Sequence, residues 1–306
     1  MISELKINKM TSDLKIKEEF DKRLDRNYDP SFEFSAVLGE YLLSLFWLDR
    51  EWVEKNINNI FPKDNEKHWS IAFTGYLHSD SRVWEEIYLL LKENGHYEKA
   101  INIPFDDEDS NKYCIQQIVI GFLEDLEKLD DVNSLISNLL NSKNKDFLSQ
   151  IIYFLCDTDI VGKNKEKVKP LWKAIVDILI QKQDDPEYQK IIAQLLMFIS
   201  LIDEIDDNVL EWLMFSAKYA TVEHNLDQFL RLLSEHTVKT PKYVTQILIE
   251  VVKNGVPKHY YQGEEIKEIV EKLYLHGEKE LAIRICNICL ERWGDFLKDI
   301  YNKYNE

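Results

Sequence analysis

The sequence predicts an all-α protein, and more specifically an irregular α-solenoid of antiparallel helix pairs of the tetratricopeptide or HEAT type. Glycine and proline supply only 9 and 7 of the 306 residues, and so few helix-breaking residues favour helix along most of the chain. Apolar residues recur at helical spacing in stripes one helix face wide. A helix–stop–helix junction also occurs twice, and repetition of such a unit is typical of repeat arrays.

The repeated junction has the pattern Ile-x3-Leu-x3-Gly-x4-Ala-Ile and lies at residues 87–101 and 269–283. We expect its glycines, Gly95 and Gly277, to adopt the left-handed conformation that ends the first helix, because glycine has no Cβ to clash there. The small alanine of the pattern lets the second helix approach the first closely.

The helices are predicted in order along the chain. Residues 1–30 are expected to form a polar N-terminal helix or linker, and residues 31–306 the solenoid. Pro30 stands just before the first core helix, as helices allow. Short polar connections make sequential helices pack antiparallel. The helices predicted after residue 30 are 31–49, 50–61, one capped by Asp64 or Asn65, two more within 69–101, 112–129, 131–141, 145–156, 166–182, 186–202, 208–220, one around 226–233, 240–254, 263–276, 278–293 and a last one to about 304.

The apolar stripes also predict which residues form the core. Trp47, Trp69, Trp172 and Trp212 fall on such stripes and are expected to be buried. The stripe of the helix predicted at 31–49 comprises Phe34, Val37, Leu38, Tyr41, Leu42 and Leu45. An alternative to the solenoid, two globular helical bundles that divide near 161–165, stays open.

The net charge and the N-terminal sequence restrict the kinds of partner and the cellular location that we expect. A formal net charge of −17 argues against nucleic acid and against an anionic membrane surface, because both require basic protein surface. The N-terminus has no apolar signal region, and no stretch approaches the roughly 18 apolar residues that a membrane span requires. Four cysteines in 306 residues fit a reducing compartment. We therefore expect a cytoplasmic protein.

Motifs for catalysis, cofactors and metals are not found. Gly162-Lys163 has neither the preceding glycine nor the following Ser or Thr of a phosphate-binding loop. Cys286 and Cys289 are spaced as in a zinc or redox motif, but they lie within a predicted helix and offer two ligands where structural zinc uses four. We expect these thiols to be reduced, buried and free of metal, and we predict no catalytic residue and no cofactor.

One loop is predicted to bind a partner. His259, Tyr260 and Tyr261 lie between Pro257 and Gly263, in a connection between two predicted helices. Aromatic residues exposed in such a loop are common anchors of protein interfaces. We therefore predict these three residues as partner-binding residues.

Apolar and small residues at helix-packing positions carry a resemblance to a known group of proteins. They lie at Trp69–Leu77, Val83–Leu91 and Tyr97–Ile101, and in similar character at Val37–Tyr41 and Ile266–Gly277. This pattern resembles the helical C-terminal regions of large bacterial defence proteins, notably the antiviral STAND NTPases. The resemblance implies a repeat-built sensor that recognises an invader (phage) protein, with the NTPase and effector domains outside this chain.

Two kinds of function therefore remain. The first is a non-catalytic protein-recognition module, the sensor of an antiphage defence system or a stand-alone scaffold. The second is a helical enzyme or small-ligand-binding protein with its site in an acidic cluster such as Asp203–Asp207. The sequence favours the first, because a solenoid needs no catalytic motif to bind a protein.

Overall fold

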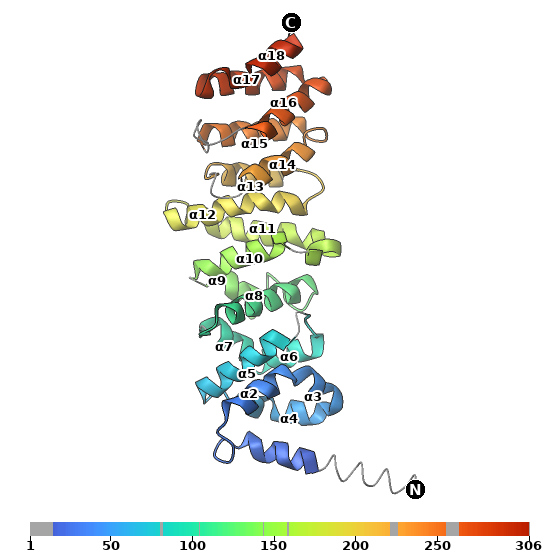
Figure 1. The fold of residues 1–306 in the computed structure, drawn as a ribbon, viewed down its shortest axis with the longest axis vertical. Coiled ribbons are helices and arrows are strands. Elements are labelled where there is room, and N and C mark those ends of the chain that lie inside the picture. The colour runs from blue at the N-terminus through green and yellow to red at the C-terminus, as the bar shows by residue number, and fades with distance from the viewer. Residues whose placement is uncertain are drawn as a thin grey trace, which may run out of the picture. The chain divides into compact units, whose positions relative to one another are not determined.

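The computed structural model describes residues 15–79, 82–103, 105–142, 144–157, 159–220, 226–254 and 263–305. Within these ranges the chain is helical and forms no β-strand (Figure 1), which confirms the all-α prediction. None of the helices described there is long and apolar enough to cross a membrane. The chain divides into two compact units, unit 1 (Met1–Leu139) and unit 2 (Leu140–Glu306).

Unit 1 begins, in its described part, with helical residues 15–24. This segment packs on the following helices, because the Trp52 indole nitrogen donates a hydrogen bond of 2.7 Å to Asp21 and the Phe20 ring lies 5.8 Å from the Phe34 ring. The remaining helices are α2 (Phe32–Glu40), α3 (Leu42–Leu48), α4 (Arg50–Ile60), α5 (Glu66–Ser79), α6 (Glu85–Glu93), α7 (His96–Asn102) and α8 (Glu108–Leu123), and the boundary between the units falls within α9 (Leu135–Asn141).

Stacked aromatic rings form the centre of unit 1. The Trp69 ring lies nearly parallel to the rings of Phe73 and Phe105, at centroid distances of 5.3 and 5.6 Å, and the Tyr97 ring meets Phe73 edge-on at 5.6 Å. All four side chains are buried. They come from α5, α7 and the connection to α8, so this cluster joins three successive segments of the chain.

The predicted stripe of residues 31–49 is only partly correct. The region forms two helices, α2 and α3, that meet at Tyr41. The residues that face the core are Ser35, Leu38, Gly39, Leu42 and Phe46, a stripe displaced by about one residue from the predicted one. The displacement arises because α2 turns its small residues Ser35 and Gly39 toward α5, which allows a closer approach than Val37 and Tyr41 would.

This displaced stripe leaves Trp47 outside the core. Its side chain is 64% exposed, so the expectation that Trp47 is buried is wrong. Trp69 and Trp172 are fully buried, as expected, while Trp212 is half-buried.

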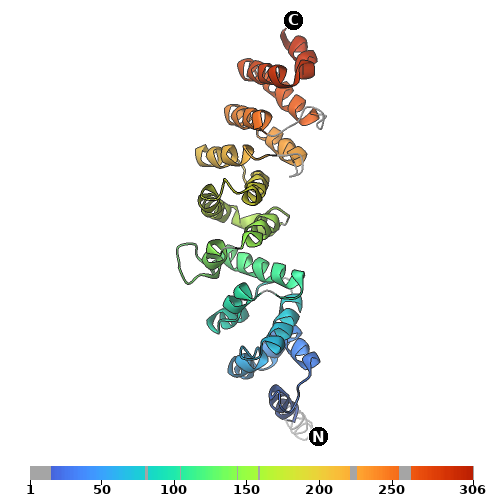
Figure 2. The ribbon, with the colours of Figure 1, turned by 90° about the vertical axis from the view of Figure 1, so that its left-hand side faces the viewer.

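Unit 2 consists of successive helices in two rows. The helices α13, α15 and α17 pack one after another, α14, α16 and α18 form a second row, and neighbours in the chain bridge the rows; Figure 2 shows this alternation from yellow to red. Its elements are α10 (Lys145–Asp157), η1 (Asp159–Asn164), α11 (Lys165–Ile180), α12 (Pro186–Gln194), η2 (Leu195–Leu201), α13 (Asp207–Ala217), α14 (Leu226–Glu235), α15 (Pro241–Asn254), α16 (Glu264–Leu275), α17 (Lys279–Trp293), η4 (Asp295–Leu297) and α18 (Lys298–Asn305).

The repeated junction has the expected geometry at both positions. Gly95, between α6 and α7, has φ 70°, and Gly277, between α16 and α17, has φ 82°. The Ile, Leu and Ala of the pattern are buried in both copies: Ile87, Leu91 and Ala100 in unit 1, and Ile269, Leu273 and Ala282 in unit 2. The same local sequence therefore produces the same helix–stop–helix unit in two separate parts of the chain.

Candidate functional site

The predicted partner-binding loop is not among the residues that the structure describes. His259, Tyr260 and Tyr261 lie within 255–262, outside the described residues.

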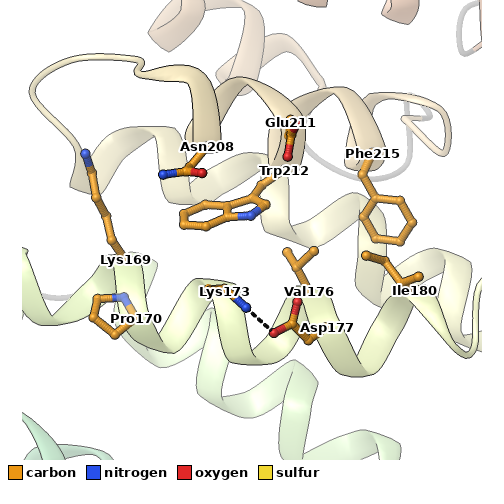
Figure 3. Close-up of a pocket in the computed structure, with 10 residues that line it drawn as sticks. All are labelled: Lys169, Pro170, Lys173, Val176, Asp177, Ile180, Asn208, Glu211, Trp212 and Phe215. Carbon is orange, nitrogen blue, oxygen red and sulfur yellow. Dashed lines mark hydrogen bonds and ion pairs between the residues drawn. The ribbon is translucent and has the colours of Figure 1, made fainter.

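A groove in unit 2 lies between α11 and α13, and we call it the α11–α13 groove. Its volume is about 530 Å³, and its lining side chains lie between the two helices (Figure 3). Its lining comes from both helices and includes apolar and polar side chains. The lining residues are Lys169, Pro170, Lys173, Val176, Asp177 and Ile180 of α11, and Asn208, Glu211, Trp212 and Phe215 of α13.

Aromatic packing holds the groove's largest side chain in place. The Trp212 ring lies 5.3 Å from the ring of Trp172, which in turn meets the Phe198 ring edge-on at 5.2 Å. Trp172 and Phe198 are fully buried, so the half-buried Trp212 packs against the core through Trp172 while part of it lines the groove. A large aromatic surface held in this way loses little conformational entropy when it binds.

Hydrogen bonds and ion pairs position the start of α13 beside α11. The Asp206 carboxylate accepts a hydrogen bond from the backbone nitrogen of Val209, which caps α13. The same carboxylate pairs with Lys169 of α11 at 2.6 Å. Asp206 thus links the two walls of the groove at one end.

The charged side chains that line the groove are mostly paired. Lys173 and Asp177 form an ion pair of 2.5 Å along α11, visible in Figure 3, while Glu211 has no ion pair with any residue that the structure describes. Pairs this exposed contribute little stability, with a median of about 0–1 kcal/mol. The groove therefore offers an apolar surface bordered by nearly neutralised charge, which suits an apolar side chain better than an ionic ligand.

Most of the carboxylates within Asp203–Asp207, where the alternative enzyme function would place a site, bind other residues of the protein. Asp203 pairs with Lys165 at 2.8 Å, and Asp207 accepts a hydrogen bond of 2.5 Å from the Tyr243 hydroxyl. Together with the capping role of Asp206, these contacts join α11, α13 and α15. They account for most of the carboxylates in this cluster without a ligand.

A serine, a histidine and an aspartate meet in unit 1 without forming a catalytic triad. The His78 Nε2 lies 3.0 Å from Asp107 Oδ2 and 3.2 Å from Ser110 Oγ, so both contacts use one ring nitrogen, whereas a triad uses both. Ser110 is fully buried and donates a hydrogen bond of 2.6 Å to Asp107. The Ser110 and His78 contacts lower the pKa of Asp107 to about 2. This cluster caps the N-terminus of α8.

The predicted free thiols lie in the core. Cys286 and Cys289 are buried on α17. Burial raises the pKa of the Cys289 thiol to about 12 and also raises the pKa of Cys286. Across the described ranges, no three or more His, Cys, Asp or Glu side chains are grouped so that they could hold a metal ion.

The sequence contains part of the signal for the α11–α13 groove. Ile180 follows Val176 by four residues and Phe215 follows Trp212 by three, so each helix carries a second apolar strip at helical spacing. That these two strips lie side by side depends on tertiary packing. In comparisons with known proteins, no protein-family model, no curated protein and no solved structure matches the chain.

Proposed function

We propose that this chain is a non-catalytic helical-repeat module, an irregular α-solenoid of the tetratricopeptide or HEAT kind, that binds a protein partner. The two rows of helices in unit 2 support the solenoid reading, and so does the junction repeated at Gly95 and Gly277. In repeat proteins of this kind, each unit buries its apolar face against its neighbours, and the exposed faces are free to bind.

The α11–α13 groove is the observation that carries the proposal. Trp212 rests on the buried Trp172, and Phe215 and Ile180 extend the apolar surface beside it. Interface hot spots are commonly aromatic residues in such sites. We propose that an apolar side chain of the partner enters this groove.

The partner we propose is an invader protein, and the setting is antiphage defence in the bacterial cytoplasm. This part rests on the resemblance of Trp69–Leu77 and Tyr97–Ile101 to the sensor regions of antiviral STAND NTPases. In that case a separate NTPase or effector would supply the chemistry, and this chain would supply recognition.

The test is capture of phage proteins from infected cells, followed by direct binding of each purified candidate. Replacement of Phe215 by Ala and of Ile180 by Ser should weaken binding about tenfold or more, which corresponds to about 1.4 kcal/mol. Tyr153→Ala is the matched control, because Tyr153 is an exposed aromatic residue of unit 2 that does not line the groove. Thermal unfolding of each variant separates lost binding from lost folding.

Two results would overturn the proposal. One is a purified partner that binds the groove variants as tightly as it binds the wild type. The other is a turnover by the purified chain that disappears when a carboxylate of Asp203–Asp207 is replaced, and this result would favour the enzyme reading.

A further inference from the structure

We infer that unit 1 carries a second binding surface, formed by Trp47, Leu48 and Trp84, and that it binds a basic protein segment with an apolar face. We call these three residues the Trp47 surface. Trp47 is 64% exposed and Leu48 is 82% exposed. Tyr41, at the point where α2 and α3 meet, is 52% exposed. Such a concentration of large exposed apolar side chains is unusual on a surface that contacts only water.

Ring contacts hold the two tryptophans of the Trp47 surface beside each other. The Trp47 ring meets the Trp84 ring edge-on at a centroid distance of 6.0 Å, and it meets the ring of the buried Phe46 edge-on at 6.4 Å. Trp84 is the N-cap residue of α6, so α3 and the start of α6 are joined through these rings. Because both tryptophans are fixed by their neighbours, a partner that binds them has little side-chain motion to restrict.

The net charge of unit 1 indicates which kind of partner would bind the Trp47 surface. Unit 1 holds 16 Lys and Arg against 28 Asp and Glu, a net of −12, whereas unit 2 holds 22 against 27, a net of −5. The acidic excess is therefore concentrated in the unit that carries the Trp47 surface. A basic partner would be attracted to it, and a second copy of the same acidic unit would be repelled.

Three carboxylates close in sequence to the residues of the Trp47 surface could bind basic side chains of the partner. Glu85 directly follows Trp84, Glu51 lies in the first turn of α4 just after Leu48, and Glu40 ends α2. Within the part of the chain that the structure describes, these three carboxylates form no ion pair. Of the nearby cations, Arg50 pairs with Glu54 at 2.6 Å and Arg82 lies over the Trp84 ring at 5.1 Å. Lysine or arginine side chains that flank an apolar anchor would therefore find unpaired carboxylates.

This inference rests on the proposed function for its premise that the chain binds proteins, but it concerns a different unit and can fail alone. The probes are three labelled helical peptides of about 16 residues. The first has a leucine face flanked by lysines, the second has the same face flanked by glutamates, and the third has the lysines with serine in place of leucine. Binding to the full chain is measured by fluorescence anisotropy at low and moderate salt.

We expect the lysine–leucine peptide to bind, and both other peptides to bind at least about tenfold more weakly. Trp47→Ala and Leu48→Ser should each reduce its affinity by about tenfold or more. Val132→Ser is the matched control for Leu48→Ser, because Val132 is also 82% exposed in unit 1 but lies in the connection between α8 and α9. Glu51→Lys combined with Glu85→Lys should reduce the affinity and the salt dependence together.

Several outcomes would overturn the inference. They are equal binding of the lysine and glutamate peptides, peptide binding unaffected by Trp47→Ala and Leu48→Ser, and dimerisation of the chain that is lost in Leu48→Ser. The last outcome, measured by light scattering, would assign the surface to a second copy. None of them bears on the α11–α13 groove, whose variants Phe215→Ala and Ile180→Ser test the proposed function separately.

Discussion

Gly39 of α2 and Gly75 of α5 lie at one helix crossing, and each faces the backbone of the other helix. A Cβ on Gly39 would lie 1.8 Å from the carbonyl oxygen of Ala72, and a Cβ on Gly75 would lie 2.4 Å from the carbonyl oxygen of Ala36. Real Cβ atoms do not approach other atoms this closely. The two helices therefore pack at a distance that only glycine permits at these two positions.

Gly39→Ala should destabilise the protein, although alanine is the better helix former. The gain in helix propensity is about 1 kcal/mol, whereas forcing an extra carbon into a packed interface costs about 1–3 kcal/mol or more. The obstacle here is backbone, which cannot rotate away as a side chain can, so we expect a cost at the upper end of this range and a net loss of about 2 kcal/mol. Urea unfolding measures it, and Ser44→Ala, at an exposed position of α3, should change stability by less than about 0.5 kcal/mol. Unchanged stability of Gly39→Ala would contradict the close crossing.

Stability should fall as the pH decreases below neutral, partly because of His96. This side chain is fully buried, and burial, with smaller contributions from Lys63 and Lys99, lowers the pKa of His96 to about 3 from its usual 6.5. Between these two pH values the unfolded chain binds a proton that the folded chain does not. The contribution of neutral His96 to the free energy of unfolding is therefore complete above about pH 6.5. It is lost as the pH falls toward 3, at about 1.4 kcal/mol per pH unit.

The measurement is the free energy of unfolding at several pH values from about 7 to 4.5 for the wild type and for His96→Phe. The variant should lose less stability per pH unit than the wild type. Burial also lowers the pKa of His68 in the same unit, but this residue is present in both proteins and cancels in the difference. Identical slopes would mean that His96 is accessible to protons in the folded state.

Glu127→Ala should be among the most damaging single substitutions in unit 1. The buried Glu127 carboxylate accepts hydrogen bonds from the Tyr88 hydroxyl at 2.9 Å, the Ser134 hydroxyl at 2.6 Å and the Leu135 backbone nitrogen at 2.7 Å, and it pairs with Lys92 at 2.6 Å. Its removal leaves the buried Tyr88 and Ser134 hydroxyls and the buried Leu135 nitrogen without this acceptor, and each buried donor left unsatisfied costs about 1–3 kcal/mol. Glu124→Ala, at an exposed position three residues earlier, serves as the control in thermal unfolding. A similar small effect of both substitutions would show that water replaces the carboxylate.

Of the four cysteines, only Cys156 should react quickly with a thiol reagent in the folded protein. Cys114, Cys286 and Cys289 are buried, and burial raises the pKa of the Cys114 and Cys289 thiols to about 12. The reactive thiolate is therefore scarce at these positions at pH 8, whereas Cys156 is partly exposed. Ellman's reagent should modify about one thiol per chain in the fast phase, and none in Cys156→Ser. A fast phase that persists in Cys156→Ser would place one of the other thiols at the surface.

The local features of this protein could be read from its sequence. Helix content, the left-handed Gly95 and Gly277, and the burial of Trp69 and Trp172 follow from composition, from the conformational freedom of glycine and from apolar spacing. Each depends on residues within a few turns of one another, and a single helix already contains that information.

The binding surfaces depend on which helix faces meet, and the sequence alone does not determine this. Trp47 lies on an apolar stripe and is nevertheless exposed, because α3 turns Leu42 and Phe46 toward the core instead. Trp212 and Ile180 are 32 residues apart, and they line one groove only because α13 lies beside α11. A helix with two apolar strips can bury either one, and the choice follows from the shape of a partner helix that lies far along the chain.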